Sequence, residues 1–207
     1  MGEQADVHVK ILNATSTDAL MQVYDDWSDR YEHELLDEWG YSSPQMALTL
    51  LKRYINIEGT HILDAGCGTG LVGVLLAEAG VGQLSGVDYS AGMLEKAAAK
   101  NVYDNLSQMD LNKPVPIESG LFDAVSCIGT FTSTHVIPEA VRELVRLTRA
   151  NGVVVFTVRD DYWEATQFVD LIADMHSEGI VRIEEIRIEP YIHSEGSECR
   201  FVVLTVL

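Results

Sequence analysis

The sequence of 207 residues predicts an α/β domain built on a seven-stranded mixed sheet, with helices on both faces and a C-terminal antiparallel hairpin. Three observations predict it. A buried strand beginning at His61 runs into a glycine-rich turn and an apolar helix that ends at Gly80. From there to Gly179, short apolar runs alternate with helical patterns, as expected for parallel strands joined by helices. Two final apolar runs, 183–192 and 199–207, flank a polar turn and indicate the hairpin.

Composition indicates one globular domain over residues 1–207, because 47% hydrophobic and 22% charged residues are ordinary for a chain with one buried core. Within it we expect an N-terminal helical lid or cap over residues 1–56 and a core over residues 57–207. The net charge of −18 argues against a nucleic-acid partner, because the chain has no surplus of Lys and Arg to neutralise phosphates.

The three cysteines, Cys67, Cys127 and Cys199, are widely spaced and contain no C-x-x-C pair. Neither disulfides nor a zinc site is therefore expected. The N-terminus lacks the apolar segment of a signal peptide, and no run has the length that spans a membrane. We expect a cytoplasmic protein without membrane contact, in an oligomeric state that the sequence leaves open.

Two helices are predicted ahead of the first strand. The first begins at Thr17 and carries apolar residues at helical spacing. Its solvated face is expected to carry Asp25, Asp26 and Asp29. The second covers residues 45–54, after Ser43 as the N-cap and Pro44 as the first helical residue. Both helices would lie over the carboxyl end of the first strand.

The glycine-rich turn after the first strand predicts a nucleotide-type cofactor site, because the following helix presents unpaired N–H groups to it. Two registers fit this turn. Gly68, Gly70 and Gly73 match the dinucleotide fingerprint G-x-G-x-x-G, with Asp88 twenty residues after the first glycine. That register leaves an NAD(P)- or flavin-linked oxidoreductase as an alternative. The other register, D-x-G-x-G-x-G from Asp64, sets an acid at the strand edge, which suits a cationic cofactor bearing an amino acid.

The remaining elements follow in order along the chain. Further strands are predicted over 84–88, 102–106, 122–128 and 153–158, and further helices over 91–100, 138–149 and 164–178. The 138–149 helix is expected to close at Asn151-Gly152. Asp88 falls at the tip of the second strand, where a carboxylate can accept hydrogen bonds from two ribose hydroxyls. The loop 129–135 follows the central strand at the same edge of the sheet.

D-x-G-x-G-x-G after a strand, with an acid at the end of the next strand, resembles the class I S-adenosylmethionine-dependent methyltransferases over about residues 20–207. The tracts V-Y-D-D-W and W-G-Y-S-S-P resemble the small group named after the Williams–Beuren chromosomal region, and more loosely the type 11 small-molecule enzymes. The resemblance implies a Rossmann-like fold, S-adenosyl-L-methionine as cofactor and a methyltransferase (transferase) activity.

The resemblance also implies roles for individual residues. The implied cofactor-binding residues are Tyr24, Tyr31, Asp64, Gly66, Cys67, Gly68, Asp88, Tyr89, Met93, Asp110, Leu111, Ile128 and Gly129. Tyr89 and Met93 would flank the adenine, and Asp110 would accept a hydrogen bond from its amino group. In this family the aromatic residues of the first helix close over the cofactor. The alternative is a helix that docks its aromatic stripe into the core.

Four residues are expected at the methyl acceptor: Trp27, Thr130, Arg159 and Trp163. His135 is the candidate general base, because a pKa near 6.5 suits proton removal at neutral pH. The competing interpretation is a histidine that pins its own loop.

No metal-ligand cluster is evident, and the tract Ile128-Gly-Thr-Phe131 departs from the Asn/Asp-Pro-Pro-aromatic pattern of amino-directed nucleic-acid and glutamine methylation. A small-molecule O or N acceptor is therefore expected. A non-catalytic S-adenosylmethionine-binding protein is the remaining alternative.

Overall fold

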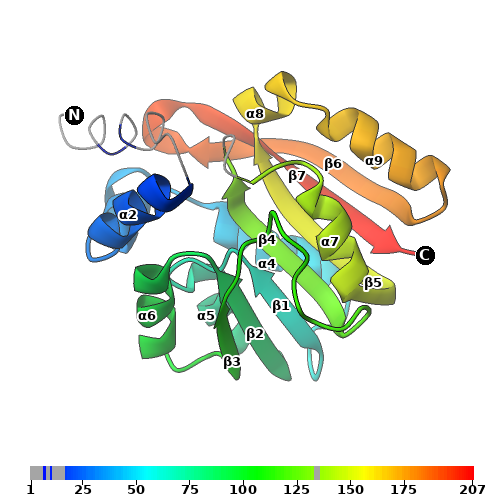
Figure 1. Ribbon diagram of the computed structural model, residues 1–207, viewed down its shortest axis with the longest axis horizontal. Coiled ribbons are helices and arrows are strands. Elements are labelled where there is room, and N and C mark those ends of the chain that lie inside the picture. Colours follow the sequence, from blue (N-terminus) through cyan, green and yellow to red (C-terminus); the bar gives the residue numbers. More distant parts are fainter. Residues whose placement is uncertain (1–6, 8–9, 11–16, 133–135) are drawn as a thin grey trace.

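The computed structural model describes residues 7, 10, 17–132 and 136–207. Its centre is a seven-stranded sheet in the order β3-β2-β1-β4-β5-β7-β6 (Figure 1). The strands are β1 His61–Ala65, β2 Gln83–Asp88, β3 Asn105–Gln108, β4 Phe122–Phe131, β5 Thr148–Arg159, β6 Val181–Ile192 and β7 Ser197–Val206. The first five pair in parallel, and β7 pairs antiparallel with both β5 and β6. The predicted mixed sheet and terminal hairpin are confirmed.

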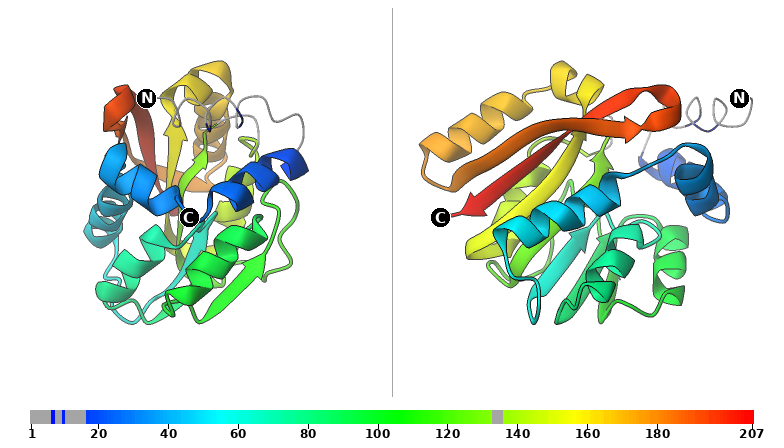
Figure 2. Two further views of the ribbon diagram at one scale, coloured as in Figure 1. Left: turned by 90° about the vertical axis from the view of Figure 1, so that its left-hand side faces the viewer. Right: turned by 180° about the vertical axis from the view of Figure 1, so that it is seen from behind.

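Helices cover both faces of this sheet, since α7 lies in front of it in Figure 1 and α4 in front of it in the view from behind (Figure 2). The described helices are α2 Thr17–Trp27, α3 Tyr31–His33, the π-helix Glu34–Glu38, α4 Ser43–Tyr54, α5 Leu71–Glu78, α6 Ala91–Ala99, α7 Ala140–Leu147, α8 Asp160–Ala165, α9 Phe168–Ser177 and the 3-10 turn His193–Glu195.

The core forms two layers because successive strand residues point to opposite faces of the sheet. On β1, Leu63 packs in the layer of α7 and α9, whereas Ile62 packs in the layer of α4 and α5. Such strands, buried on both faces, explain the continuous apolar runs of the sequence.

Several predicted boundaries were wrong. Strand β4 continues to Phe131, into the predicted loop 129–135, β5 begins at Thr148 and not at 153, and the N-cap of α4 is Ser42 and not Ser43. The strand predicted over 102–106 begins only at Asn105, because Tyr103 turns its side chain inward to Asp64. The helix predicted over 138–149 ends at Leu147, and Asn151 instead adopts a positive φ of 60° where β5 slips in register against β4. The helix predicted over 164–178 is divided into α8 and α9.

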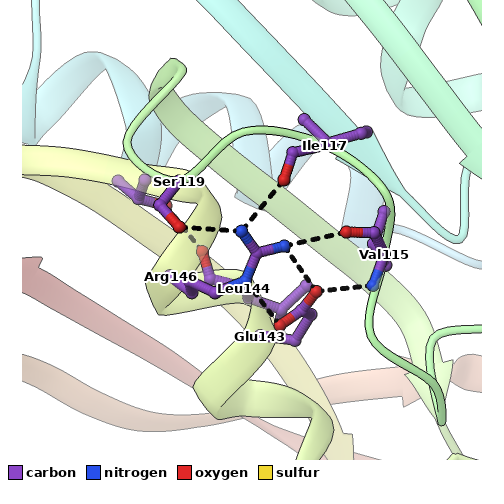
Figure 3. A network of polar contacts seen from close by, with 7 residues as sticks. Val115, Ile117, Ser119, Glu143, Leu144 and Arg146 are labelled. Atoms are coloured by element: carbon purple, nitrogen blue, oxygen red, sulfur yellow. Dashed lines mark hydrogen bonds and ion pairs between the residues drawn. The ribbon is translucent and has the colours of Figure 1, made fainter.

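The loop that leads from β3 to β4 is fastened to α7 by one arginine (Figure 3). The Arg146 guanidinium donates to the carbonyl oxygens of Val115 and Ile117 and to Ser119 Oγ, at 2.8–2.9 Å. It also donates to Glu143, whose carboxylate accepts from the Val115 amide at 2.6 Å. The loop is therefore held to α7 over residues 115–119, a few residues after Asp110.

Candidate cofactor and acceptor site

The glycine turn between β1 and α5 has a geometry that side chains would disturb. Gly66, Gly68 and Gly70 have φ values of 71°, 54° and 91°, the left-handed region that favours glycine. A Cβ at Gly66 would also lie 2.2 Å from Thr130 Oγ1. The Gly66 and Cys67 amides donate to the Val87 carbonyl at 2.7 and 3.0 Å, which ties the turn to β2.

Asp88 lies at the end of β2, and its carboxylate accepts a hydrogen bond from the glycine turn. Its Oδ2 accepts from the Gly68 amide at 2.8 Å, and its Oδ1 accepts from the Ser90 amide at 2.9 Å. Burial raises the pKa of Asp88, while the amides of Ser90, Gly68 and Tyr89 oppose that rise. The carboxylate is thus held in one orientation at the wall of a cavity.

This cavity opens between the glycine turn, β2, β4 and the N-terminal helices. The expected residues that line it are Tyr24, Tyr31, Gly66, Cys67, Gly68, Asp88, Tyr89, Met93, Asp110, Leu111, Ile128, Gly129 and Thr130. The structure therefore brings nearly the whole expected cofactor set, and one expected acceptor residue, to a single site.

Further lining residues were missed by the sequence analysis: Tyr41, Pro44, Thr69, Leu71, Val72, Ser90, Met109, Asn112, Thr132 and Val136. Tyr41 and Pro44 lie in the tract W-G-Y-S-S-P, which marks the family resemblance and was expected only to begin a helix. Met109 and Asn112 adjoin Asp110 and Leu111, so proximity in sequence would have found them.

Tyrosines gather at the Gly129 side of the cavity. A Cβ at Gly129 would lie 2.7 Å from Tyr41 Oη, and the Tyr41 and Tyr191 rings meet edge to face at 5.3 Å. Burial, followed by the charge of Asp88, raises the pKa of Tyr24 to about 12, and burial holds the pKa of Tyr31 well above its ordinary value. These phenols are neutral hydrogen-bonding groups at any physiological pH.

The N-terminal segment that carries Tyr24 and Tyr31 is attached to α6. The Asp25 carboxylate accepts from the Gly92 amide at 3.1 Å and from Ser90 Oγ, so it caps the N-terminus of α6. The expectation that Asp25 belongs to the solvated face was therefore wrong. Asp29 pairs with Lys96 on α6, and Glu32 pairs at 2.5 Å with Lys100, the residue that follows α6.

Trp27 does not line the cavity, although it was expected at the acceptor. Its side chain is 4% exposed, its indole N–H donates to Glu34 Oε2 at 2.6 Å, and its ring packs against Tyr31 and Trp39. Trp27 is therefore a core residue, as the alternative interpretation of the first helix expects.

The two residues expected at the end of β5 also lie outside the cavity lining. Trp163 is buried and stacks on Phe168 at 5.8 Å, with the Arg200 guanidinium 5.2 Å from its centroid. Arg159 pairs with Asp161 at 3.1 Å. His135, the candidate base, lies outside the described residues, whereas Thr132 and Val136 on either side of 133–135 line the cavity.

Asp64 lies beneath the glycine turn and not on the cavity wall where we expected it. It is 1% exposed, and its Oδ2 accepts from the Tyr103 hydroxyl at 2.7 Å. Its Oδ1 is buried without a hydrogen-bond partner in the part of the chain that the structure describes. Burial raises the pKa of Asp64 to about 7; the Tyr103 hydrogen bond lowers it and the charge of Asp88 raises it.

Tyr103 also explains the second glycine register. A Cβ at Gly73 would lie 2.1 Å from Tyr103 Oη, so the third glycine of G-x-G-x-x-G makes room for a phenol. The match to the dinucleotide fingerprint therefore has a cause unrelated to a pyrophosphate. The oxidoreductase alternative rested mainly on that match and loses this support.

The groups that line this site fit S-adenosylmethionine. A carboxylate fixed at the end of β2 suits ribose hydroxyls, and Met93, Leu111 and Ile128 provide apolar surface for a purine. Thr69 Oγ1, in the turn, is buried without a partner among the described residues. Over 17–132 and 136–207, no group of three or more His, Cys, Asp or Glu side chains is arranged to hold a metal ion. Nor does this described part contain a helix long and apolar enough to cross a membrane.

Comparisons with known proteins agree with this geometry. A sequence model of a methyltransferase domain matches residues 63–156. Methyltransferase-like protein 27 of Homo sapiens is 37% identical over 142 residues, which cover 67% of this chain and 57% of that protein. A malonyl-(acyl-carrier protein) O-methyltransferase of Legionella pneumophila is 32% identical over 161 residues, which cover 69% and 55%. The chain thus spans about half the length of the curated relatives it matches.

A solved structure shows the same fold with the product form of the cofactor. Magnesium protoporphyrin IX methyltransferase of Synechocystis, with bound S-adenosylhomocysteine, aligns with a TM-score of 0.66 over 90% of this chain and 99% of that one, at 16% identity. Together with the family match and the similar relatives, the fold shows that the chain belongs to the class I S-adenosylmethionine-dependent methyltransferases, whose cofactor fits the site described above.

Proposed function

We propose that this protein transfers a methyl group from S-adenosylmethionine to an oxygen or nitrogen of a small molecule. One observation carries the proposal: the fixed Asp88 carboxylate and the neutral phenols of Tyr31 and Tyr41 line the same cavity. One end of the cavity suits the cofactor, and the other suits a compact acceptor with hydrogen-bonding groups. The free, buried Cys67, Cys127 and Cys199 support a cytoplasmic location as part of the same proposal.

S-adenosylmethionine supplies a methyl group that is already activated by its sulfonium charge. The protein mainly has to hold the acceptor atom close to this group and in line with it, which can contribute up to about 7–11 kcal/mol. In our proposal Asp88 binds the ribose, and Thr69 Oγ1, which lines the cavity without a partner among the described residues, binds the amino-acid end. Tyr24, Tyr31 and Tyr41 orient the acceptor and exclude water.

A general base is needed only where the acceptor atom starts protonated. We assign this role to His135, because its neighbours Thr132 and Val136 line the cavity. Thr130 is the other residue that we assign to the acceptor, since it follows Gly129 on the same wall.

The test combines binding with turnover. Calorimetry with S-adenosylhomocysteine should show specific binding, and Asp88→Ala should weaken it by about 2–4 kcal/mol, because two charge-assisted hydrogen bonds are lost. Asp170→Ala, at an exposed position on α9, is the matched control. Transfer of labelled methyl to a metabolite panel then tests the activity. Intact binding without transfer to any member of a broad panel would favour the non-catalytic alternative.

A further inference from the structure

We propose that Tyr103 is a positioning residue, whose hydroxyl orients the Asp64 carboxylate beneath the glycine turn and favours its charged form, ready for a cationic cofactor. Tyr103 comes from the segment between α6 and β3, remote in sequence from the turn, and its hydroxyl donates to Asp64 Oδ2 at 2.7 Å. The inference depends on S-adenosylmethionine being the ligand of this cavity, and it does not depend on which molecule accepts the methyl group.

The Tyr103 ring occupies a slot that three glycines keep open. A Cβ would lie 3.1 Å from its ring at Gly70, 2.1 Å from its hydroxyl at Gly73 and 2.9 Å from its ring at Gly86. Gly73 belongs to the first turn of α5 and Gly86 to β2, so the slot is built from two separate elements. A phenol enclosed in this way has little freedom to move away from Asp64.

The electrostatics explain why Asp64 needs this partner. The groups that act on it are acidic or neutral: Tyr103, Asp88 at the end of β2, and the Gly73 amide of α5. The thiol of Cys67 lies in the same turn, and its pKa is raised by burial and by the charges of Asp64 and Asp88. A buried carboxylate beside a second one favours its protonated form. The Tyr103 hydrogen bond opposes this, because it stabilises the ionised form.

Ionised Asp64 and Asp88 give the turn a negative potential on both sides. Such a potential favours a ligand with a sulfonium and an ammonium group over a neutral or anionic nucleotide. Without the Tyr103 hydroxyl, a larger fraction of Asp64 would be protonated at neutral pH, and its contribution to this potential would fall.

The decisive variant is Tyr103→Phe, which removes the hydroxyl and keeps the ring in its slot. Tyr54→Phe is the matched control, because the Tyr54 hydroxyl also donates to a carboxylate, that of Glu185, at 2.9 Å and away from the cavity. In the ligand-free protein, carbon NMR should show the Asp64 carboxyl titrating at least about one unit higher in Tyr103→Phe than in the parent. This readout does not depend on whether the protein turns over any acceptor.

Binding provides the second readout. At neutral pH, Tyr103→Phe should bind S-adenosylhomocysteine about tenfold more weakly, and the affinity should recover as the pH rises toward about 9. Tyr54→Phe should match the parent throughout. An unchanged titration of Asp64, or an affinity loss of equal size at every pH, would overturn the proposal and leave Tyr103 as a packing residue.

Asp64→Asn keeps the proposal testable if Tyr103→Phe does not fold. Asparagine cannot ionise, so this variant should bind weakly, with an affinity that lacks the pH dependence the parent shows between about pH 6 and 8. A parent affinity that is flat over that range would equally contradict the proposal.

Discussion

Replacement of Asp64 by asparagine should make the ligand-free protein more stable at neutral pH. The pKa of this carboxyl is raised from its ordinary value of 3.8 to about 7, chiefly by burial. Between these two values the folded protein binds more protons than the unfolded chain, so stability is lost as the pH rises through that window. An asparagine side chain at this position would have no such titration, and its amide oxygen can still accept from Tyr103.

The magnitude follows from about 1.4 kcal/mol per pKa unit. At about pH 5.5 only part of the ionisation penalty is present, whereas at about pH 8 nearly all of it is. The difference in free energy of unfolding between Asp64→Asn and the parent should therefore be larger at the higher pH by about 2 kcal/mol. Urea denaturation of the ligand-free proteins at both pH values measures it.

Asp170→Asn, which removes an exposed acid on α9, is the control and should show no comparable change. The same difference at both pH values for Asp64→Asn would refute the reasoning, because Asp64 would then not titrate within the window. The expected result describes a residue that destabilises the empty protein in order to serve the cofactor, as is common at functional sites.

Two further predictions concern the acceptor end and the N-terminal segment. His135→Ala should lower turnover by about 10²-fold or more, because a base would be lost, while the affinity for S-adenosylhomocysteine stays unchanged; turnover within a few-fold of the parent would show that proximity alone suffices. Hydrogen exchange over residues 17–35 should slow when S-adenosylhomocysteine binds, because Tyr24 and Tyr31 line the cavity. Exchange there should quicken in high salt, which screens the pairs Asp29–Lys96 and Glu32–Lys100; equal protection with and without ligand would indicate a fixed core element.

The sequence predicted those elements that a hydrophobic run or a glycine-rich turn marks. The central part of strand β5, residues 153–158, was clear because it is an almost continuous apolar run, and the turn at Gly66–Gly70 was clear because glycine is favoured at its φ values. The cofactor residues came from the resemblance, which assigns positions along the chain, and the cavity contains nearly all of them.

The failures concern residues whose role depends on three-dimensional contacts. Trp27 and Trp163 have the right residue type in the right segments, but their rings pack into the core, Trp27 against Trp39 and Trp163 against Phe168. Tyr103 looked like a strand residue because periodicity does not reveal a side chain that turns under another element. Arg146 gave no signal at all, since the loop carbonyls it holds are backbone groups common to any sequence.

The slot around Tyr103 also constrains how this sequence can change over time. The absent side chains at Gly73 and Gly86 and the ring at position 103 are complementary in volume, so a mutation at one site changes which residues the others tolerate. A methyl group at Gly73 would collide with the phenol, whereas a smaller residue at 103 would first leave a void costing about 3–5 kcal/mol. Whether Gly73 or Tyr103 changes first, the single variant is destabilised. The three positions should therefore vary together among descendants of this sequence or not at all, and a glycine pattern can persist for the sake of an aromatic ring thirty residues downstream.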